Sequence, residues 1–468
     1  MSTENYGIDP DRPTHNLAVR SAAPDGHVDP AVEFVPDAHQ PAAAAAYLRT
    51  TDAIRTRAAA LLARARRGES AWFRVGDANA LEDAAREVAE VTRDRYDWGP
   101  IPYHSRWRHF EAGGVDRLAQ LDALLEGATP RERAKAHIDL VVVSVLLDAG
   151  AGPDWHYTES ASGQRFSRSE GLGVASFHAF TSGLFSSDPD RPLQADAAGL
   201  KGLVGDRLAQ AFQASEANPL VGLSGRTILL RRLGEVLAEQ PEVFGTEVQR
   251  PGGLFDMLVS PDGAAVPPTA DIEAHAILTQ LLMSLSSIWP AANRVDSLAA
   301  DGSDVLPGSG DPALALGDCW RHSAVQGPGL TNGWMPFHKL SQWLTYSLIE
   351  PFEWAGVQVR GIDRLTALPE YRNGGLLIDS GVLVPQDAAF LDKTWRVGDE
   401  FIVEWRALTV ALLDELAPLV RKNLQRDEAD MPLACVLEGG TWAAGRALAQ
   451  RLRGGTPPLK IESDGTVF

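Results

Sequence analysis

The stretch GDEFIVEWRALTVALLDELAPLVRKNL, residues 398–424, decides the fold class of this sequence. Its large apolar side chains recur at intervals of three or four positions, at Phe401, Trp405, Leu408, Leu412 and Leu416. This spacing places them along one face of an α-helix, where they can be buried against a neighbouring element. A long helix with one face in the core is therefore predicted here.

Helical patterns also dominate the sequence outside this stretch. They cover residues 41–70, 79–96, 131–150, 167–185, 271–290 and 337–352. Ser167 and Glu170 have the spacing of a capping box at the start of one of them. Strand patterns are scarce, and the best are residues 374–385 and 459–468. The sequence therefore predicts a mainly α protein, a compact helical fold with few short strands.

The first part of the chain differs from the rest in composition. Residues 1–40 are polar and rich in proline and aspartate, which predicts a flexible N-terminal arm. Residues 41–468 are expected to form a single helical catalytic unit, with 41–290 and 291–468 as candidate sub-lobes.

Charge and cysteine content narrow the class of protein. The 468 residues include 43 basic and 62 acidic side chains, a net charge of −19, which disfavours nucleic acid and anionic membranes as partners. Cys319 and Cys435 are isolated in the sequence, so no disulfide framework is expected. The N-terminus has no signal-peptide pattern, and no apolar run is long enough to span a bilayer. We expect a soluble cytoplasmic protein with a small-molecule substrate.

Common catalytic motifs are incomplete in this sequence. GLSGR at 222–226 lacks the final glycine of a nucleophile elbow, and GSGD at 308–311 follows no clear strand. His104 and His109 lack the HExxH spacing of a zinc site. The sequence therefore predicts neither a metal nor another cofactor.

Two stretches combine aromatic and charged residues in loops. Residues 154–171 and 317–324 contain the candidate substrate-binding side chains Trp155, His156, Tyr157, Arg168, Trp320, Arg321 and His322. Such loops can form the rim of a ligand site. A surface loop with one anchoring tryptophan, or an ordinary turn, explains the same composition.

A third stretch, WMPFHKLSQWLTY at 334–346, places Lys339, Gln342 and Tyr346 on one face of a helix. The face is either solvated or directed into a cleft. In a fourth stretch, at 368–384, Glu370, Tyr371 and Arg372 follow Pro369 and precede two glycines. These residues form either a substrate site at a structured turn or an ion pair that caps a helix.

The stretch EGGTWAAGR at 438–446 is a weaker candidate for binding phosphate. Gly439, Gly440 and Thr441 could present backbone amides at a helix N-terminus, with Arg446 beyond them. A plain helix entry is the alternative.

Seven stretches, taken in order, resemble the uracil-catabolism protein 4 family of fungi and bacteria. They are HIDLVVVSVLLDAGAGPDWHYTE (137–159), GQRFSRSEGLGVASFHAF (163–180), NPLVGLSGRTILLRRLG (218–234), WRHSA (320–324), PFHKLSQWLTYSLIEPFEWAG (336–356), LPEYRNGGLLIDSGVL (368–383) and LEGGTWAAGR (437–446). The resemblance extends over about residues 35–468. It implies a step of uracil breakdown after the pyrimidine ring has opened, in which urea is split from ribose.

A second resemblance is to the queuosine-5′-phosphate N-glycosylase family, which is helical and similar in architecture to DNA glycosylases. It rests on residues 361–383 and 403–417, with KLSQW at 339–343 and LFSSDP at 184–189. The catalytic lysine and aspartate of that family fall on Lys339 and Glu370. Glutamate replaces aspartate here, and NGG replaces the family's VPQ, so the resemblance implies a smaller leaving group.

Together these resemblances imply an N-glycosidase that hydrolyses ribosylurea or its 5′-phosphate. Glu370 would stabilise the ribosyl cation, and Lys339 and His338 would assist the leaving group. Trp155, His156 and Tyr157 would wall the site with Tyr371 behind, and Arg321 and Arg372 are candidates to bind phosphate. Two alternatives stay open: a metal-dependent amidohydrolase acting on the urea moiety, and a non-catalytic binding protein of the same pathway.

Overall fold

The structure is a computed structural model that describes residue 33 and residues 35–148, 150–260, 270–288, 293, 295 and 314–462. For Ala78 the description covers the backbone only. Most of the predicted N-terminal arm therefore lies outside the described residues. Val35–Phe468 form one compact unit, and only this unit is described below.

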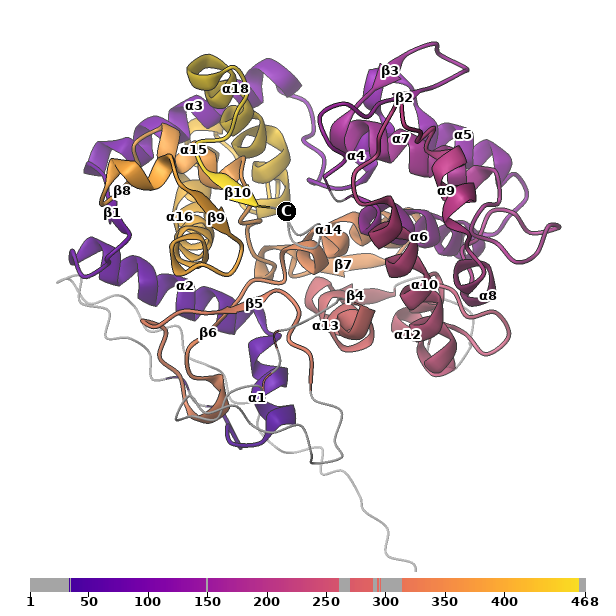
Figure 1. The fold of residues 1–468 in the computed structure, drawn as a ribbon, viewed down its shortest axis with the longest axis horizontal. Coiled ribbons are helices and arrows are strands. Elements are labelled where there is room, and N and C mark those ends of the chain that lie inside the picture. The colour runs from indigo at the N-terminus through magenta and orange to yellow at the C-terminus, as the bar shows by residue number, and fades with distance from the viewer. Residues whose placement is uncertain are drawn as a thin grey trace, which may run out of the picture. The chain divides into compact units, whose positions relative to one another are not determined.

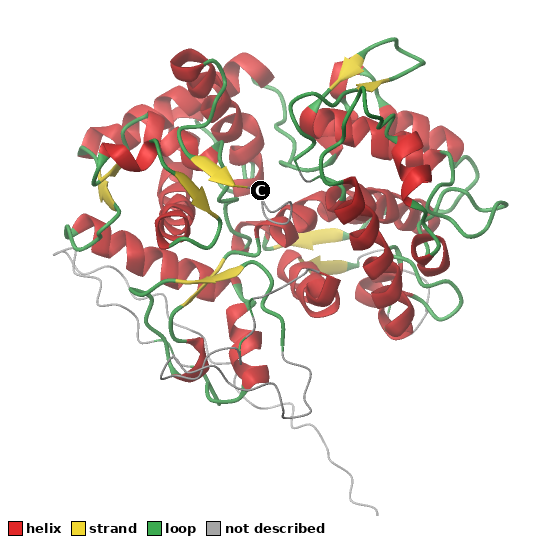
Figure 2. Cartoon of the chain, viewed as in Figure 1, coloured by secondary structure: helices red, strands yellow, loops and turns green. Residues whose placement is uncertain are grey.

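The unit is mainly α, as the sequence predicts (Figure 2). The helices are α1 Pro41–Leu48, α2 Thr51–Arg66, α3 Ala78–Tyr96, α4 Trp107–Phe110, α5 Arg117–Leu124, α6 Pro130–Leu146, α7 Arg168–Thr181, α8 Ala197–Lys201, α9 Gly205–Ala211, α10 Leu223–Glu239, α11 Pro241–Phe244, α12 Gly253–Val259, α13 Ala274–Leu285, α14 Lys339–Trp354, α15 Asn373–Asp379, α16 Glu400–Leu424, α17 Leu433–Val436 and α18 Trp442–Arg453. Short 3-10 turns are η1 Ala112–Gly114, η2 Ser286–Ile288, η3 Gly329–Thr331, η4 Ile362–Arg364 and η5 Ala388–Leu391, and η6 Leu437–Thr441 is a π-helical turn.

The strands that the structure describes have two or three residues each and form isolated pairs. Antiparallel pairs join β1 Phe73–Val75 with β8 Leu383–Pro385, β2 Tyr157–Thr158 with β3 Arg165–Phe166, and β5 Cys319–Arg321 with β6 Trp334–Pro336. Parallel pairs join β4 Asp271–Glu273 with β7 Gln358–Arg360, and β9 Thr394–Arg396 with β10 Lys460–Glu462. These pairs pin loops to one another and build no sheet layer.

The predicted helix at 398–424 is α16, and it is the centre of one group of helices. Every side chain from Phe401 to Leu413 is buried, so the helix is enclosed on all sides over three turns. It packs against α2, α3 and α15, and α18 packs on α15 and α3 (Figure 1). Helices from the beginning and the end of the described chain therefore share one core.

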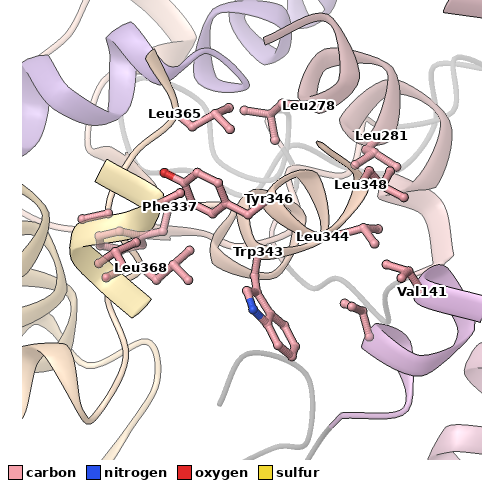
Figure 3. Close-up of a cluster of buried hydrophobic side chains, with 14 of the residues drawn as sticks. Val141, Leu278, Leu281, Phe337, Trp343, Leu344, Tyr346, Leu348, Leu365 and Leu368 are labelled. Atoms are coloured by element: carbon pink, nitrogen blue, oxygen red, sulfur yellow. The ribbon is translucent and has the colours of Figure 1, made fainter. Parts of the chain in front are cut away.

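A second group of helices surrounds α6, which packs against α7, α10 and α12 (Figure 1). Helix α14 contacts α6 and α13, and it carries apolar side chains on more than one side. Figure 3 shows Leu365 and Leu278 beside Tyr346, while the Trp343 indole points away from them. Helix α14 is thus buried on more than one of its sides.

Three local predictions differ from the structure. The helix predicted at 41–70 is interrupted, because the Thr50 side chain accepts a hydrogen bond from Ala53 N and caps a new helix. Residues 374–385 were predicted as a strand, but helix α15 occupies their first half. The capping box at Ser167 is wrong, since the Ser167 side chain makes no cap hydrogen bond.

Two further predictions concern membranes and cysteines. None of the helices in the described ranges is both long and apolar enough to cross a bilayer. Cys319 and Cys435 are both buried free thiols, as their isolation in the sequence predicts.

Candidate functional site

Glu370 lies at the start of α15 and is fixed there by its carboxylate. Its Oε2 accepts a hydrogen bond of 2.8 Å from Arg372 N, and its Oε1 accepts one of 2.6 Å from Asn373 N. The side chain is buried. Burial raises the pKa of Glu370 above its ordinary value, although the two amides and the charges of Lys339 and His104 act in the opposite direction.

Lys339 is the first residue of α14, and its backbone N–H donates a hydrogen bond of 3.0 Å to Asp318 Oδ2. The side chain is half-buried, and its ammonium forms no hydrogen bond or ion pair with any residue that the structure describes. Burial lowers the pKa of Lys339, and the charges of Glu370 and Asp148 partly oppose this shift. Lys339 and Glu370 therefore lie in one region, each within electrostatic reach of the other.

Two sets of contacts bring these residues together. On α14, Gln342 Oε1 accepts a hydrogen bond of 3.2 Å from Thr366 N, and the Tyr346 hydroxyl donates one of 3.0 Å to Thr366 O. The face predicted from Lys339, Gln342 and Tyr346 thus binds the segment that leads to Glu370. From α16, Arg406 forms two hydrogen bonds of 2.7 Å with Asp318 and one of 3.3 Å with Pro369 O.

Arg406 and Asp318 therefore connect both candidate catalytic residues. Asp318 binds the backbone of Lys339, and Arg406 binds the carbonyl that precedes Glu370. Burial would raise the pKa of Asp318, but the Arg406 charge and its hydrogen bonds hold that pKa at about 2. The pair is ionised at neutral pH.

A polar group from α4, α6 and α14 lies next to these residues. Asp148, just after α6, has its Oδ1 3.0 Å from Arg106 Nη1. The Arg106 guanidinium is 5.7 Å from the Trp343 ring centroid, and the His109 ring is 5.7 Å from that ring at 81°. The Asp148 charge acts on Lys339 and on His109. We call Glu370, Lys339, Asp148, Arg106, His109 and Trp343 the Glu370 cluster.

Several buried polar atoms in and beside this cluster have no hydrogen-bond partner among the described residues. They are Arg106 Nη2, His109 Nδ1, Gln342 Nε2 and Trp343 Nε1. Asp148 Oδ1 is ion-paired with Arg106 Nη1 but makes no hydrogen bond of good geometry, so it can still accept one. Buried polar groups normally form hydrogen bonds. A buried polar group without one often marks a place where water or a ligand binds. The set offers both donors and acceptors, which suits a small ligand rich in hydroxyl and amide groups.

The edge of the cluster carries aromatic and cationic side chains. Tyr371 is 37% exposed, and its ring lies 4.9 Å from the Arg372 guanidinium carbon. Burial raises the pKa of Tyr371, and the charges of Glu370, Arg372, Asp148 and Arg168 act on it. Glu170 Oε1 pairs with Arg446 Nη1 at 3.2 Å, which connects α7 to α18.

Two non-glycine residues with positive φ adjoin these side chains. His338, which precedes Lys339, has φ 50°, and Arg168, at the start of α7, has φ 55°. Such left-handed conformations are uncommon for residues with a Cβ and concentrate at functional sites. The His338 imidazole is committed elsewhere, because Nε2 lies 2.9 Å from the Leu48 carbonyl oxygen, to which it donates a hydrogen bond.

The aromatic residues of the loop at 154–171 lie mainly in other contacts. Trp155 is buried, stacks on Phe212 and donates from Nε1 to the Phe212 carbonyl at 3.0 Å, which fits the interpretation as an anchoring tryptophan. His156 is half-buried with Nδ1 2.6 Å from Arg165 Nη2, and Tyr157 stacks on His178. The structure does not bring these three residues to the Glu370 cluster through any contact that it describes.

The three candidates at 320–322 also have structural partners. Trp320 donates from Nε1 to Asp318 Oδ1 at 2.7 Å, and the Arg321 guanidinium lies 3.8 Å from the Trp334 ring centroid. His322 is buried with Nε2 3.1 Å from Glu404 Oε2. In this stretch it is Asp318, which the sequence did not single out, that reaches Lys339.

The phosphate-site hypothesis for Gly439, Gly440 and Thr441 is wrong in its premise. These residues lie inside the π turn η6, which runs directly from α17 into α18, so no helix begins there. A Cβ on Gly440 would lie 2.5 Å from Thr92 Oγ1 and from Val88 O on α3. The glycines therefore allow close packing of η6 on α3.

Sequence reasoning missed Asp148 and Arg106, and it considered His104 and His109 only as metal ligands. These residues are separated in sequence, and their common location depends on how α4, α6 and α14 pack. The unusual local density of His and Arg in HSRWRH at 104–109 was the available signal. Among the described residues, no group of three or more His, Cys, Asp or Glu side chains could hold a metal ion.

Comparison with known proteins places the chain in a family. Residues 47–468 match the family described as "Protein of unknown function (DUF1688)". The chain is 37% identical over 433 residues to "Uracil catabolism protein 4" of Lachancea kluyveri, covering 86% of this chain and 93% of that protein. It is 38% identical over 405 residues to "Protein urg3" of Schizosaccharomyces pombe, covering 84% and 91%. The resemblance to the uracil-catabolism protein 4 family is thus confirmed, and this chain belongs to the DUF1688 family.

Proposed function

We propose that this protein acts in uracil catabolism by hydrolysing the N-glycosidic bond of ribosylurea or ribosylurea 5′-phosphate, with release of urea. The relative named "Uracil catabolism protein 4" supports the pathway. The observation that carries the reaction is the buried Glu370 carboxylate, which two backbone amides hold within electrostatic reach of Lys339. Polar atoms without a described partner belong to the same cluster.

Cleavage of a ribosyl C1′–N bond passes through a state in which positive charge develops on the ribose. A carboxylate held rigidly beside C1′ stabilises that charge without having to reorganise. The amides of Arg372 and Asn373 fix both Glu370 oxygens in place. Because burial raises its pKa, Glu370 is also a stronger base than an ordinary glutamate and can accept a proton from the attacking water.

The ligand matches the unpartnered atoms in hydrogen-bonding character. Ribosylurea carries hydroxyl groups, a carbonyl and amide N–H groups. Asp148 Oδ1 can accept from ribose hydroxyls, while Trp343 Nε1 and Gln342 Nε2 can donate to oxygens of the substrate. The Lys339 ammonium can donate to the urea oxygen. Arg168 and Arg446, at the edge of the cluster, are the cations proposed for a 5′-phosphate.

The test is urea release by the purified protein from ribosylurea and from its 5′-phosphate, before and after exhaustive chelation. Release of equimolar urea and free sugar that survives chelation would support the N-glycosidase. Release of ammonia, or activity that returns only with added zinc or manganese, would favour the amidohydrolase. Saturable binding without turnover would favour the non-catalytic binding protein.

A further inference from the structure

A histidine–carboxylate pair is buried close to the Glu370 cluster, since its histidine, His104, lies two residues before Arg106. His104 Nδ1 lies 2.7 Å from Glu438 Oε2, and both side chains are buried. Glu438 Oε1 also accepts hydrogen bonds of 2.8 Å from Arg95 Nη2 and 3.0 Å from the Tyr96 hydroxyl. Burial would raise the pKa of Glu438, but His104 and Arg95 lower it to about 2.

These contacts fix the imidazole tautomer. An ionised carboxylate can only accept hydrogen bonds, so His104 Nδ1 must be the donor to Glu438. The remaining nitrogen, Nε2, is therefore free to carry or release a proton. No residue that the structure describes forms a hydrogen bond with Nε2.

Glu438 is held by an unusual element. It lies in the π turn η6, and Arg95 on α3 also donates to the backbone carbonyls of Glu438 and Gly439. Single π turns within helices are rare and frequently occur at functional sites. Here the turn and Arg95 together hold the carboxylate against His104.

The imidazole lies within electrostatic reach of the candidate site. The His104 charge acts on Glu370 and also on His109, a member of the Glu370 cluster. By contrast, Nε2 of His338, which the sequence suggested as an assistant to the leaving group, binds the Leu48 carbonyl. His109 Nδ1 also has no described partner, but burial lowers the pKa of His109 to about 4, which disfavours a proton there. His104 is the histidine of the two that a carboxylate orients, with Nε2 left for the substrate.

We propose that His104 is the catalytic acid that protonates the departing urea nitrogen, and that Glu438 and Arg95 position it. This inference rests on the proposed N-glycosidase function. As the C1′–N bond breaks, its electron pair stays on nitrogen, which takes the proton from His104 Nε2. Water then adds to C1′ and gives its proton to Glu370. Proton return from Glu370 to His104 through solvent completes the cycle.

Chemistry favours an imidazolium for this step. Urea leaves poorly as an anion, so its nitrogen needs a proton in the transition state. An imidazolium, with an ordinary pKa of about 6.5, is a stronger acid at neutral pH than a lysine ammonium at about 10.4. Lys339 is then available to hydrogen-bond the urea oxygen.

The test compares two leaving groups in the variant His104→Ala. With ribosylurea, in whichever phosphorylation state the wild type uses, turnover should fall on the order of 10²- to 10⁴-fold. With the matching 4-nitrophenyl ribofuranoside, whose leaving group departs as a stable anion, turnover should change only a few-fold. Added imidazole should restore urea release in the variant, a response that requires a folded protein. Equal losses with both substrates and no response to imidazole would overturn the role of His104.

A matched control is His137→Ala, because His137 is also buried and pairs with a carboxylate, Asp122, at 3.1 Å. This variant should lose stability without changing the ratio of the two turnover rates. A wild-type protein that cleaves neither substrate would refute the proposed function itself. Cleavage of both by wild type, with an unchanged ratio in His104→Ala, would refute only the present inference.

The positioning role of Glu438 has its own readout. In Glu438→Gln the imidazolium loses its ionic partner, so the alkaline limb of the pH–rate profile with ribosylurea should move to lower pH. The other described groups that interact with His104 or Glu438 include Arg95, Tyr96, Glu111, Glu370, His109 and Cys435, and all are retained in this variant. An alkaline limb at the wild-type position would show that Glu438 is merely structural.

Discussion

Glu370 serves as a helix cap and as the proposed catalytic carboxylate, so a substitution changes two properties together. In Glu370→Gln an NH₂ group must face one of the two backbone N–H donors, Arg372 N or Asn373 N. Leaving that buried donor unpaired should lower the free energy of unfolding by about 1–3 kcal/mol. Loss of the negative charge should lower kcat by roughly 10²- to 10³-fold. Thermal denaturation and steady-state urea release measure the two effects separately.

The variant Glu370→Asp is the comparison that separates these effects. Aspartate keeps the charge and the acceptor oxygens but is shorter by one methylene, so activity should remain well above that of Glu370→Gln. Substrate affinity should change little in either variant, because the ribosyl charge develops only towards the transition state. If the folded Gln variant turns over like wild type, Glu370 is only a cap.

The charge of Lys339 should influence the pH below which activity is lost. Glu370 must be ionised to act. Because its pKa is raised above the ordinary glutamate value of 4.5, the acid limb of the pH–rate profile should lie above pH 4.5. Lys339 favours the ionised form, so Lys339→Met should raise the pKa of Glu370 further and move the acid limb to higher pH. Lys422→Met, at an exposed position of α16, is the matched control and should leave the limb in place. A pH–rate profile of kcat for the three proteins tests this, and an unmoved limb in Lys339→Met would contradict it.

At the scale of the element, the π turn depends on close contact with α3. A Cβ at Gly440 would lie 2.5 Å from Val88 O, a backbone atom that cannot rotate away. Gly440→Ala should therefore lower the free energy of unfolding by about 1–3 kcal/mol, in the range for overpacking. It should also lower kcat for urea release, because displacement of η6 moves Glu438 and its partner His104. Denaturant unfolding and turnover of the variant provide the measurement.

Gly225→Ala is a control for the glycine-to-alanine change itself. Gly225 is an exposed residue of α10, and a Cβ there would meet no atom within 4 Å. Its replacement should raise stability by about 0.5–1 kcal/mol, since glycine is a poor helix former. Equal effects of the two substitutions would show that contact with α3 is unimportant.

Helices could be predicted from the sequence where apolar residues recur with a clear helical period. Helix α16 has a clear helical period, and its bounds Glu400–Leu424 follow the predicted stretch closely. The run at 374–385 has no such period, so it did not reveal that α15 precedes β8. Residue 374 in α15 has to be glycine, because the Trp405 ring occupies the space that a Cβ would need. This tertiary contact cannot be deduced from the local sequence pattern.

At the scale of the whole molecule, the candidate site combines distant segments. Lys339 and Glu370 were reached through resemblance, while Asp148 and Arg106 were not, because their meeting depends on the packing of α4, α6 and α14. Helix α16 acts on the site through Arg406, which binds Asp318 and the Pro369 carbonyl. The same ion pair thus maintains the core and holds the two candidate catalytic residues.

The Arg406–Asp318 ion pair should contribute both to stability and to turnover. In Asp318→Asn, the buried Arg406 guanidinium loses its carboxylate partner, and breaking a buried pair from one side typically costs about 3–5 kcal/mol. Guanidinium chloride unfolding measures this loss without adding urea, the proposed product. Because Asp318 also binds Lys339 N and Arg406 binds Pro369 O, kcat should fall even at temperatures where the variant stays folded.

A surface pair supplies the control for Asp318→Asn. Arg451 Nη2 lies 3.1 Å from Glu87 Oε1, with 63% of the arginine side chain exposed. Exposed pairs contribute about 0–1 kcal/mol, so Arg451→Gln should change neither stability nor turnover appreciably. If Asp318→Asn instead unfolds like Arg451→Gln and keeps the wild-type kcat, Arg406 and Asp318 do not hold the site. The geometry around Lys339 and Glu370 would then have to come from the Thr366 contacts of α14 alone.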